Sequence, residues 1–98
     1  MVIVTGSITA KTEHVEEVER LSLDHVGRSR SEAGCLLHSV HRDVEDEHRF
    51  VFIEQWTDEA ALLEHFAVPA SRHFVRAVAG LAVDEPTMTA YEAEPLTF

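Results

Sequence analysis

The fold of this chain depends most on the segment Arg49-Phe50-Val51-Phe52-Ile53-Glu54-Gln55-Trp56-Thr57-Asp58. Its side chains alternate with a period of two, which is typical of a β-strand. One predicted face carries Phe50, Phe52, Glu54 and Trp56, and the other carries Val51, Ile53 and Gln55. The wider stretch from Glu32 to Phe74 also contains Glu32-Ala33-Gly34-Cys35-Leu36, Glu64-His65-Phe66 and Ser71-Arg72-His73-Phe74. We expect this stretch to carry any chemistry that the protein performs.

Hydrophobic periodicity along the whole chain predicts the element order β-α-β-β-α-β. The predicted strands cover residues 2–10, 35–42, 48–57 and 81–91, the last one broken near Pro86. The first predicted helix has Thr12 as its N-cap. The second is capped by Thr57 or Asp58, is interrupted at Pro69 and stops at Gly80. This order indicates an α+β, ferredoxin-like fold, in which both helices cover one face of an antiparallel four-stranded sheet.

The length of 98 residues predicts a single domain, covering residues 1–98. The sheet face without helices still carries apolar side chains from several predicted strands. Such a face would be an unusually large exposed apolar patch. We therefore expect a homodimer in which two sheets close face to face into a dimeric α+β barrel.

Composition narrows the classes of partner. The net charge is −10, from 18 acidic and 8 basic residues, which disfavours nucleic acid and anionic membranes as partners. Cys35 is the only cysteine, so an intrachain disulfide is impossible. The N-terminus lacks the pattern of a signal peptide, and no stretch approaches the ~20 apolar residues of a membrane span. The sequence therefore predicts a cytoplasmic protein.

Glu54 and Trp56 are the first candidate site residues. A carboxylate among aromatic side chains needs a partner or has a raised pKa, because burying an unpaired charge is costly. Glu54 could thus be an acid/base group or an anchor for a catalytic histidine, or it could simply pair with an arginine or backbone amides. Trp56 could stack on a planar ligand, or it could be an ordinary core aromatic.

His65 and His73 are the candidate bases. Both could point between helix and sheet, where a neutral imidazole can take a proton near pH 7; either could also be an ordinary surface histidine. The seven histidines are dispersed without the spacing of known metal motifs, so no metal site is predicted. Cys35 and His38 are three apart, which regular strand alternation places on opposite faces. We expect Cys35 to be a buried small hydrophobe.

The motifs quoted above resemble those of the antibiotic biosynthesis monooxygenase family, which consists of small dimeric α+β-barrel proteins and includes quinol monooxygenases. The resemblance implies chemistry without metal or flavin: a phenol or quinol is deprotonated, and its anion reduces dioxygen. It places Glu54, Trp56, His65 and His73 around the pocket. We add Phe52, Phe74 and Arg72 as substrate-binding residues, with Arg72 beside the motif to steady an anionic oxygen. His38 stands where the family often has tyrosine, so it is an extra base or marks a different substrate.

The leading hypothesis is a cofactor-independent monooxygenase that oxidises a quinol or polyphenolic aromatic with dioxygen. A non-catalytic small-molecule-binding or interaction domain and an isomerase of a small metabolite remain as alternatives, because fold does not determine function. Heme degradation, known on related proteins, is disfavoured because the chain contains no asparagine and has His65 where such enzymes carry tryptophan.

Overall fold

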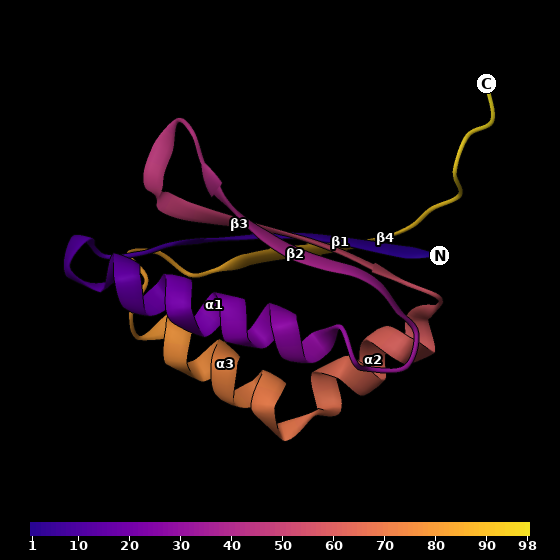
Figure 1. The fold of residues 1–98 in the computed structure, drawn as a ribbon, viewed down its shortest axis with the longest axis horizontal. Coiled ribbons are helices and arrows are strands. Elements are labelled where there is room, and N and C mark those ends of the chain that lie inside the picture. The colour runs from indigo at the N-terminus through magenta and orange to yellow at the C-terminus, as the bar shows by residue number, and fades with distance from the viewer.

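The computed structural model describes residues 1–98 and confirms the order β-α-β-β-α-β (Figure 1). Its elements are β1 (Val2–Thr9), a 3-10 turn (Thr12–His14), α1 (Val15–Ser29), β2 (Cys35–Asp43), β3 (Asp46–Trp56), α2 (Glu59–Ala67), α3 (Pro69–Ala79) and β4 (Thr87–Glu92). None of the helices is both long and apolar enough to cross a lipid bilayer.

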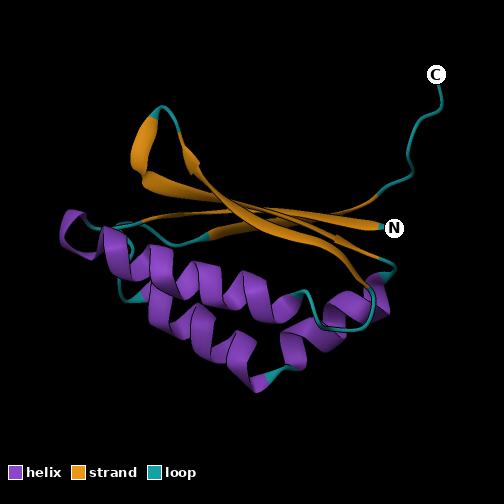
Figure 2. Cartoon of the chain, viewed as in Figure 1, coloured by secondary structure: helices purple, strands orange, loops and turns teal.

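The four strands form one antiparallel sheet in the order β2-β3-β1-β4. All three helices cover one face of this sheet, and the opposite face is left open (Figure 2). The predicted ferredoxin-like α+β fold is therefore confirmed. In the central pair, Gly6 lies opposite Phe52 and Val4 lies opposite Glu54, so the inward side chains of β1 and β3 share the helix-covered face.

Local sequence signals explain where the second helical region begins and breaks. The Asp58 carboxylate accepts a hydrogen bond from the Ala61 backbone N–H at 2.8 Å, which makes Asp58 the N-cap of α2. Pro69 occupies the first turn of α3, where its missing N–H costs nothing, and Gly80 follows the last residue. The predicted interruption at Pro69 thus separates two helices that pack on each other.

Three predicted boundaries were wrong. Residues 81–86 are not part of the last strand, which begins at Thr87; only an isolated bridge between Ala10 and Ala82 forms there. Pro86 explains this, because it lacks the N–H that a ladder requires. β3 begins at Asp46, so the hairpin is tighter than expected. The predicted Thr12 cap is replaced by a 3-10 turn, and α1 proper begins at Val15.

A β-bulge near Leu36 changes which side chains of β2 face the helices. The pairing shifts register between Cys35 and Leu37, so that Cys35 lies opposite Trp56 and His38 lies opposite Glu54. Cys35 packs against the buried cluster around Trp56. The prediction that Cys35 and His38 lie on opposite faces was therefore wrong, because the extra residue of a bulge interrupts regular alternation.

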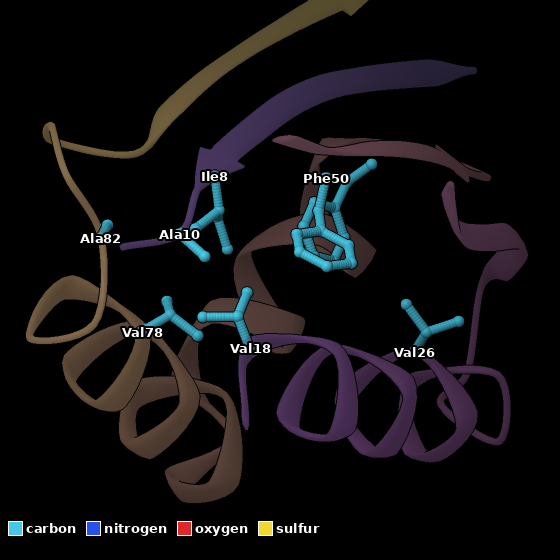
Figure 3. Packing of buried hydrophobic residues seen from close by; sticks show 8 residues of the cluster. Ile8, Ala10, Val18, Val26, Phe50, Val78 and Ala82 are labelled. Carbon is cyan, nitrogen blue, oxygen red and sulfur yellow. The ribbon is translucent and has the colours of Figure 1, made fainter. Parts of the chain in front are cut away.

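Two apolar clusters lie between the sheet and the helices. The larger one joins β1, β3, α1 and α3 (Figure 3) and contains Ile8, Ala10, Val18, Val26, Phe50, Phe52, Val78 and Ala82. The smaller one contains Val2, Val4, Trp56, Ala61 and Leu62. On β3, Glu54 stands between Phe52 of the first cluster and Trp56 of the second. The core is thus divided by a polar layer, and this layer is the candidate site.

Candidate active site

A cavity of about 550 Å³ opens between α3 and the sheet. Its buried end is formed by polar side chains: His25, His38, Glu54, His65 and Ser71. Its walls are apolar, with Ile8, Phe52, Phe66, Phe74 and Val78. Arg72, Val75 and Arg76 of α3 and Thr87 and Met88 of β4 are exposed and mark its mouth. Small-ligand sites commonly combine apolar walls with a few convergent polar groups, as here.

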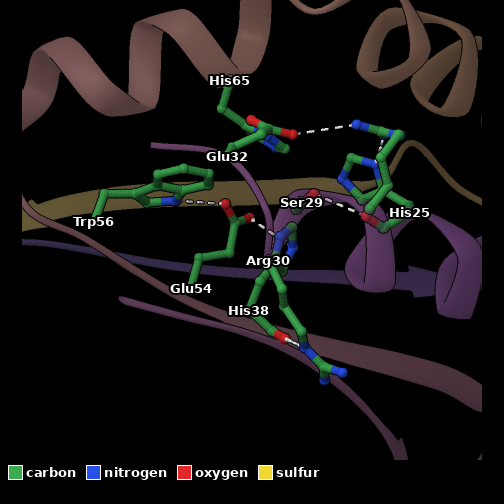
Figure 4. Close-up of polar contacts among 9 residues, drawn as sticks. His25, Ser29, Arg30, Glu32, His38, Glu54, Trp56 and His65 are labelled. Carbon is green, nitrogen blue, oxygen red and sulfur yellow. Dashed lines mark hydrogen bonds and ion pairs between the residues drawn. The ribbon is translucent and has the colours of Figure 1, made fainter. Parts of the chain in front are cut away.

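His65 of α2 forms a charge-assisted pair with Glu32, which precedes β2. His65 Nδ1 lies 2.8 Å from Glu32 Oε1, and the imidazole is almost fully buried (Figure 4). An ionised carboxylate only accepts hydrogen bonds, so Nδ1 carries a proton, and in the neutral ring the lone pair lies on Nε2. Arg28 Nη1 holds the other carboxylate oxygen at 3.2 Å. The chain Arg28–Glu32–His65 therefore fixes both the tautomer and the orientation of the ring.

Glu54 and His38 form a second polar pair, and burial disfavours the charged form of each side chain. Burial raises the pKa of Glu54, although the hydrogen bond from Trp56 Nε1 to Glu54 Oε1 at 2.9 Å opposes the shift. Burial lowers the pKa of His38 to about 3, so the imidazole is neutral at pH 7. His38 Nε2 lies 3.6 Å from Glu54 Oε2, which is too far for a hydrogen bond. Neither ring nitrogen of His38 has a hydrogen-bond partner.

His25 of α1 is the third buried imidazole of the site. Burial lowers its pKa to about 3, so this ring is also neutral at pH 7. Arg28 Nη2 lies 2.8 Å from His25 Nδ1, and because a guanidinium only donates, Nδ1 is the acceptor. The ring stacks on Phe74 with centroids 4.1 Å apart and planes 3° from parallel. His25 thus links the polar layer to the aromatic wall formed by α3.

Backbone contacts hold this layer in place. Arg30 Nε donates to the His38 carbonyl oxygen at 3.0 Å, and Ser29 Oγ donates to the His25 carbonyl oxygen at 2.7 Å (Figure 4). Ser29 is the last residue of α1, and Arg30 is its C-cap. The same helix terminus therefore positions one imidazole within the helix and another on the neighbouring strand.

The structure places most of the predicted site residues around one cavity. Glu54, His65, His38, Phe52, Arg72 and Phe74 all line it. Trp56 lies behind Glu54 and is fully buried, outside the lining. His73 is exposed on α3 and does not reach the cavity, because Ser71, Phe74 and Val78 occupy the inward side of that helix. Of the two candidate bases, only His65 faces the enclosed space.

Sequence reasoning missed His25, Glu32 and Ser71 as site residues. His25 follows Ser22 by three and Val18 by seven, which places it on the inward stripe of α1; this spacing was a usable signal. Glu32 and Ser71 were noted only as parts of motifs. Dispersion of the histidines along the sequence did not reveal that His25, His38 and His65 meet, because they belong to three different elements.

The fold and the site define a class: a small α+β protein whose cavity encloses a histidine–carboxylate pair beside aromatic walls. Residues 1–77 match the antibiotic biosynthesis monooxygenase family, and the chain belongs to this family.

Individual relatives agree with this assignment. A crystal structure of a candidate antibiotic biosynthesis monooxygenase from Deinococcus radiodurans superposes with a TM-score of 0.94 at 32% identity, over 100% of this chain and 97% of that one. YcnE of Bacillus subtilis, itself a candidate monooxygenase, is 34% identical over 66% of this chain and 68% of YcnE. The uncharacterized protein sll1783 of Synechocystis is 38% identical over 76% of this chain, which spans only 50% of that protein's length.

Proposed function

We propose that the protein is a cofactor-independent monooxygenase that deprotonates a quinol or polyphenolic aromatic with His65 and lets the anion react with dioxygen. The observation that most supports this proposal is the contact at 2.8 Å between half-buried Glu32 and buried His65, whose ring lines the 550 Å³ cavity. Family membership supports a monooxygenase. The quinol-type substrate is our inference from the family resemblance, and the aromatic walls of the cavity are compatible with it.

His65 has the arrangement that a general base needs. Glu32 holds the Nδ1 proton, so in the neutral ring Nε2 carries the lone pair that can accept a substrate proton. The same carboxylate would stabilise the imidazolium that forms after proton transfer. The cavity walls provide Phe52, Phe66 and Phe74 for contact with a planar aromatic ring. A base beside an apolar, aromatic-lined space suits the removal of a phenolic proton.

The mouth of the cavity favours anionic species. Arg72 and Arg76 line it, and neither guanidinium forms an ion pair within the chain. Although the net charge of the protein is −10, these two unpaired arginines create a local positive potential at the cavity mouth. The Ser71 hydroxyl is buried at the cavity without a hydrogen-bond partner. It is available to donate to a substrate oxygen, while Arg72 steadies developing negative charge.

The proposed reaction balances without an added cofactor. His65 takes the O–H proton, and the electron-rich anion transfers one electron to dioxygen. The resulting radical pair combines through a new C–O bond, and the peroxide anion takes the proton back from His65 to become a hydroperoxide. Loss of water from the peroxide leaves one oxygen atom on the product, so that substrate and dioxygen yield quinone-type product and water.

Oxygen uptake tests this proposal directly. Chelator-treated, flavin-free protein is assayed with a panel of quinols and anthrones, beside His65→Ala and His73→Ala. General bases typically accelerate a reaction about 10²–10⁴-fold. We therefore expect His65→Ala to lower the rate of oxygen uptake by at least about 100-fold. His73→Ala is the matched control, exposed and outside the cavity, and should retain activity. Uptake that survives in His65→Ala would remove His65 as the base.

An isomerase of a small metabolite is the second candidate, and one observation favours it. Glu54, whose burial raises the pKa of its carboxyl, lines the same cavity as His65, so two acid/base groups could move a proton between two substrate positions. Exchange of solvent deuterium into a substrate without oxygen uptake would distinguish this function. If the protein catalyses neither reaction, the remaining alternative is a non-catalytic domain that binds a small molecule in this cavity.

A further inference from the structure

We propose that His25, His38 and His65 form a binding site for a divalent transition-metal ion, best matched by Zn²⁺, at the buried end of the cavity. The three imidazoles come from α1, β2 and α2, and their candidate ligand nitrogens all lie within 4.8 Å of one another. This inference goes beyond the proposed function and does not depend on it.

The spacing of the rings fits one shared ion. Their centroids lie 5.1 Å apart for His25 and His38, 5.2 Å for His25 and His65, and 5.5 Å for His38 and His65. Three imidazoles on a tetrahedral zinc, with Zn–N of about 2.0–2.1 Å, place their centroids roughly 5 Å apart. The rings therefore need to turn toward the common centre, but their backbones need not move closer.

His38 supplies the strongest reason to expect an ion. It is only 1% exposed, and neither of its ring nitrogens has a hydrogen-bond partner. A buried polar group without a partner destabilises the folded chain, and a bound ligand would remove that cost. Its position opposite Glu54 exists only because of the bulge at Leu36.

The surroundings of His65 match those of a metal-binding histidine. Metal-ligating imidazoles usually donate their second N–H to a carboxylate, which fixes the tautomer and strengthens the ligand. His65 Nδ1 does this to Glu32 at 2.8 Å, and Nε2 remains free. Glu32 is in turn held by Arg28 at 3.2 Å.

Carboxylates also adjoin the three rings. Glu32 pairs with His65 and Glu54 lies beside His38, whereas the Arg28 guanidinium contacts His25 and Glu32, and Arg30 donates to the His38 carbonyl oxygen. Glu54 is near enough to His38 to serve as a fourth ligand, or a water could occupy that position, as in catalytic zinc sites. Arg28 must release His25 Nδ1 if that nitrogen binds the ion, and it keeps Glu32 as its partner when it does.

A filled site would change what the cavity can do. The Nε2 lone pair of His65 cannot bind a metal and accept a substrate proton at the same time. Under the proposed function, the metal-loaded protein is therefore inactive as a base-driven oxygenase. This consequence rests on that function, whereas metal binding itself is measured without any substrate.

Binding is tested on chelator-stripped protein with Zn²⁺ by calorimetry and with Co²⁺ by visible absorption. We expect one ion per chain and the intense d–d bands of tetrahedral Co²⁺. His38→Ala should weaken binding by more than 100-fold, and Glu32→Gln by roughly 10–100-fold, as expected for a partner of a ligand. His41→Ala is the matched control, an exposed histidine on the same strand, and should bind as the unmodified chain does.

Absence of d–d bands would overturn the site, and so would metal binding that persists unchanged in His38→Ala. His25→Phe guards against loss of the fold, because phenylalanine can keep the stacking on Phe74 that His25 now makes. Circular dichroism checks that each variant is folded. If folded His25→Phe binds the ion as tightly as the unmodified chain, the three-histidine site is excluded. None of these measurements involves oxygen uptake, so failure here is separate from failure of the proposed function.

Discussion

Glu32 determines how His65 can act, although no ligand needs to touch it. Replacing it by glutamine keeps an acceptor for the Nδ1 proton but removes the charge that stabilises an imidazolium. We expect Glu32→Gln to reduce oxygen uptake by roughly 10–100-fold, as for other partners of functional histidines. The downfield proton resonance of His65 Nδ1 should shift or disappear in the same variant. An unchanged resonance with full activity would show that the 2.8 Å contact has no functional role.

The reactivity of Cys35, the single cysteine, should depend on both folding and pH. Burial raises the pKa of Cys35, and the nearby Glu32 and Glu54 carboxylates raise it further. A raised pKa lowers the fraction of reactive thiolate at any pH below it. We therefore expect iodoacetamide to modify the folded protein at pH 8 more slowly than the urea-unfolded protein, with the difference shrinking as the pH rises. Equal rates would contradict this, and Cys35 is the only thiol that can react.

Gly34 controls how three elements meet. It has a φ of +82°, and a Cβ there would lie 2.6 Å from Ala61 Cβ of α2 and 2.7 Å from Thr57 Oγ1. Its carbonyl oxygen also accepts the Thr57 N–H at 2.9 Å, which joins the start of β2 to the end of β3. We expect Gly34→Ala to lower the free energy of unfolding by about 1–3 kcal/mol or more, through both strain and overlap.

Urea unfolding measures this change, and Gly27→Ala is its matched control. Gly27 lies within α1, and a Cβ there would meet no atom within 4 Å. Alanine at an unstrained helical position commonly stabilises by about 0.4–1 kcal/mol. The two substitutions should therefore shift the urea midpoint in opposite directions. A shift in the same direction would show that Gly34 is not a strained junction.

At the scale of the whole molecule, the open face of the sheet carries exposed apolar side chains. Ile3, Leu37, Ile53 and Tyr91 lie on this face, and Leu37, Ile53 and Tyr91 are exposed. We propose a homodimer in which two such faces pack together, as expected from the sequence. Light scattering after size exclusion should give twice the chain mass of 11.0 kDa. Ile53→Glu should give the chain mass, whereas Leu63→Glu, on the exposed side of α2, should remain dimeric. A monomeric unmodified protein would contradict the proposal.

The sequence by itself determined those features of the fold that depend on residues close together along the chain. Period-two alternation placed Phe52, Glu54 and Trp56 on one face, and Pro69 and Gly80 marked where helices begin and end. It therefore predicted the α+β fold and the inward position of Glu54, because strand and cap signals are local.

Only the tertiary structure decided which distant side chains meet. His65 pairs with Glu32 across 33 residues, and the bulge at Leu36 turns both Cys35 and His38 inward. His25, His38 and His65 converge because packing of α1 and α2 on the sheet brings their elements together, which spacing along the chain does not encode. The same packing leaves His73 outside the cavity and Trp56 behind Glu54.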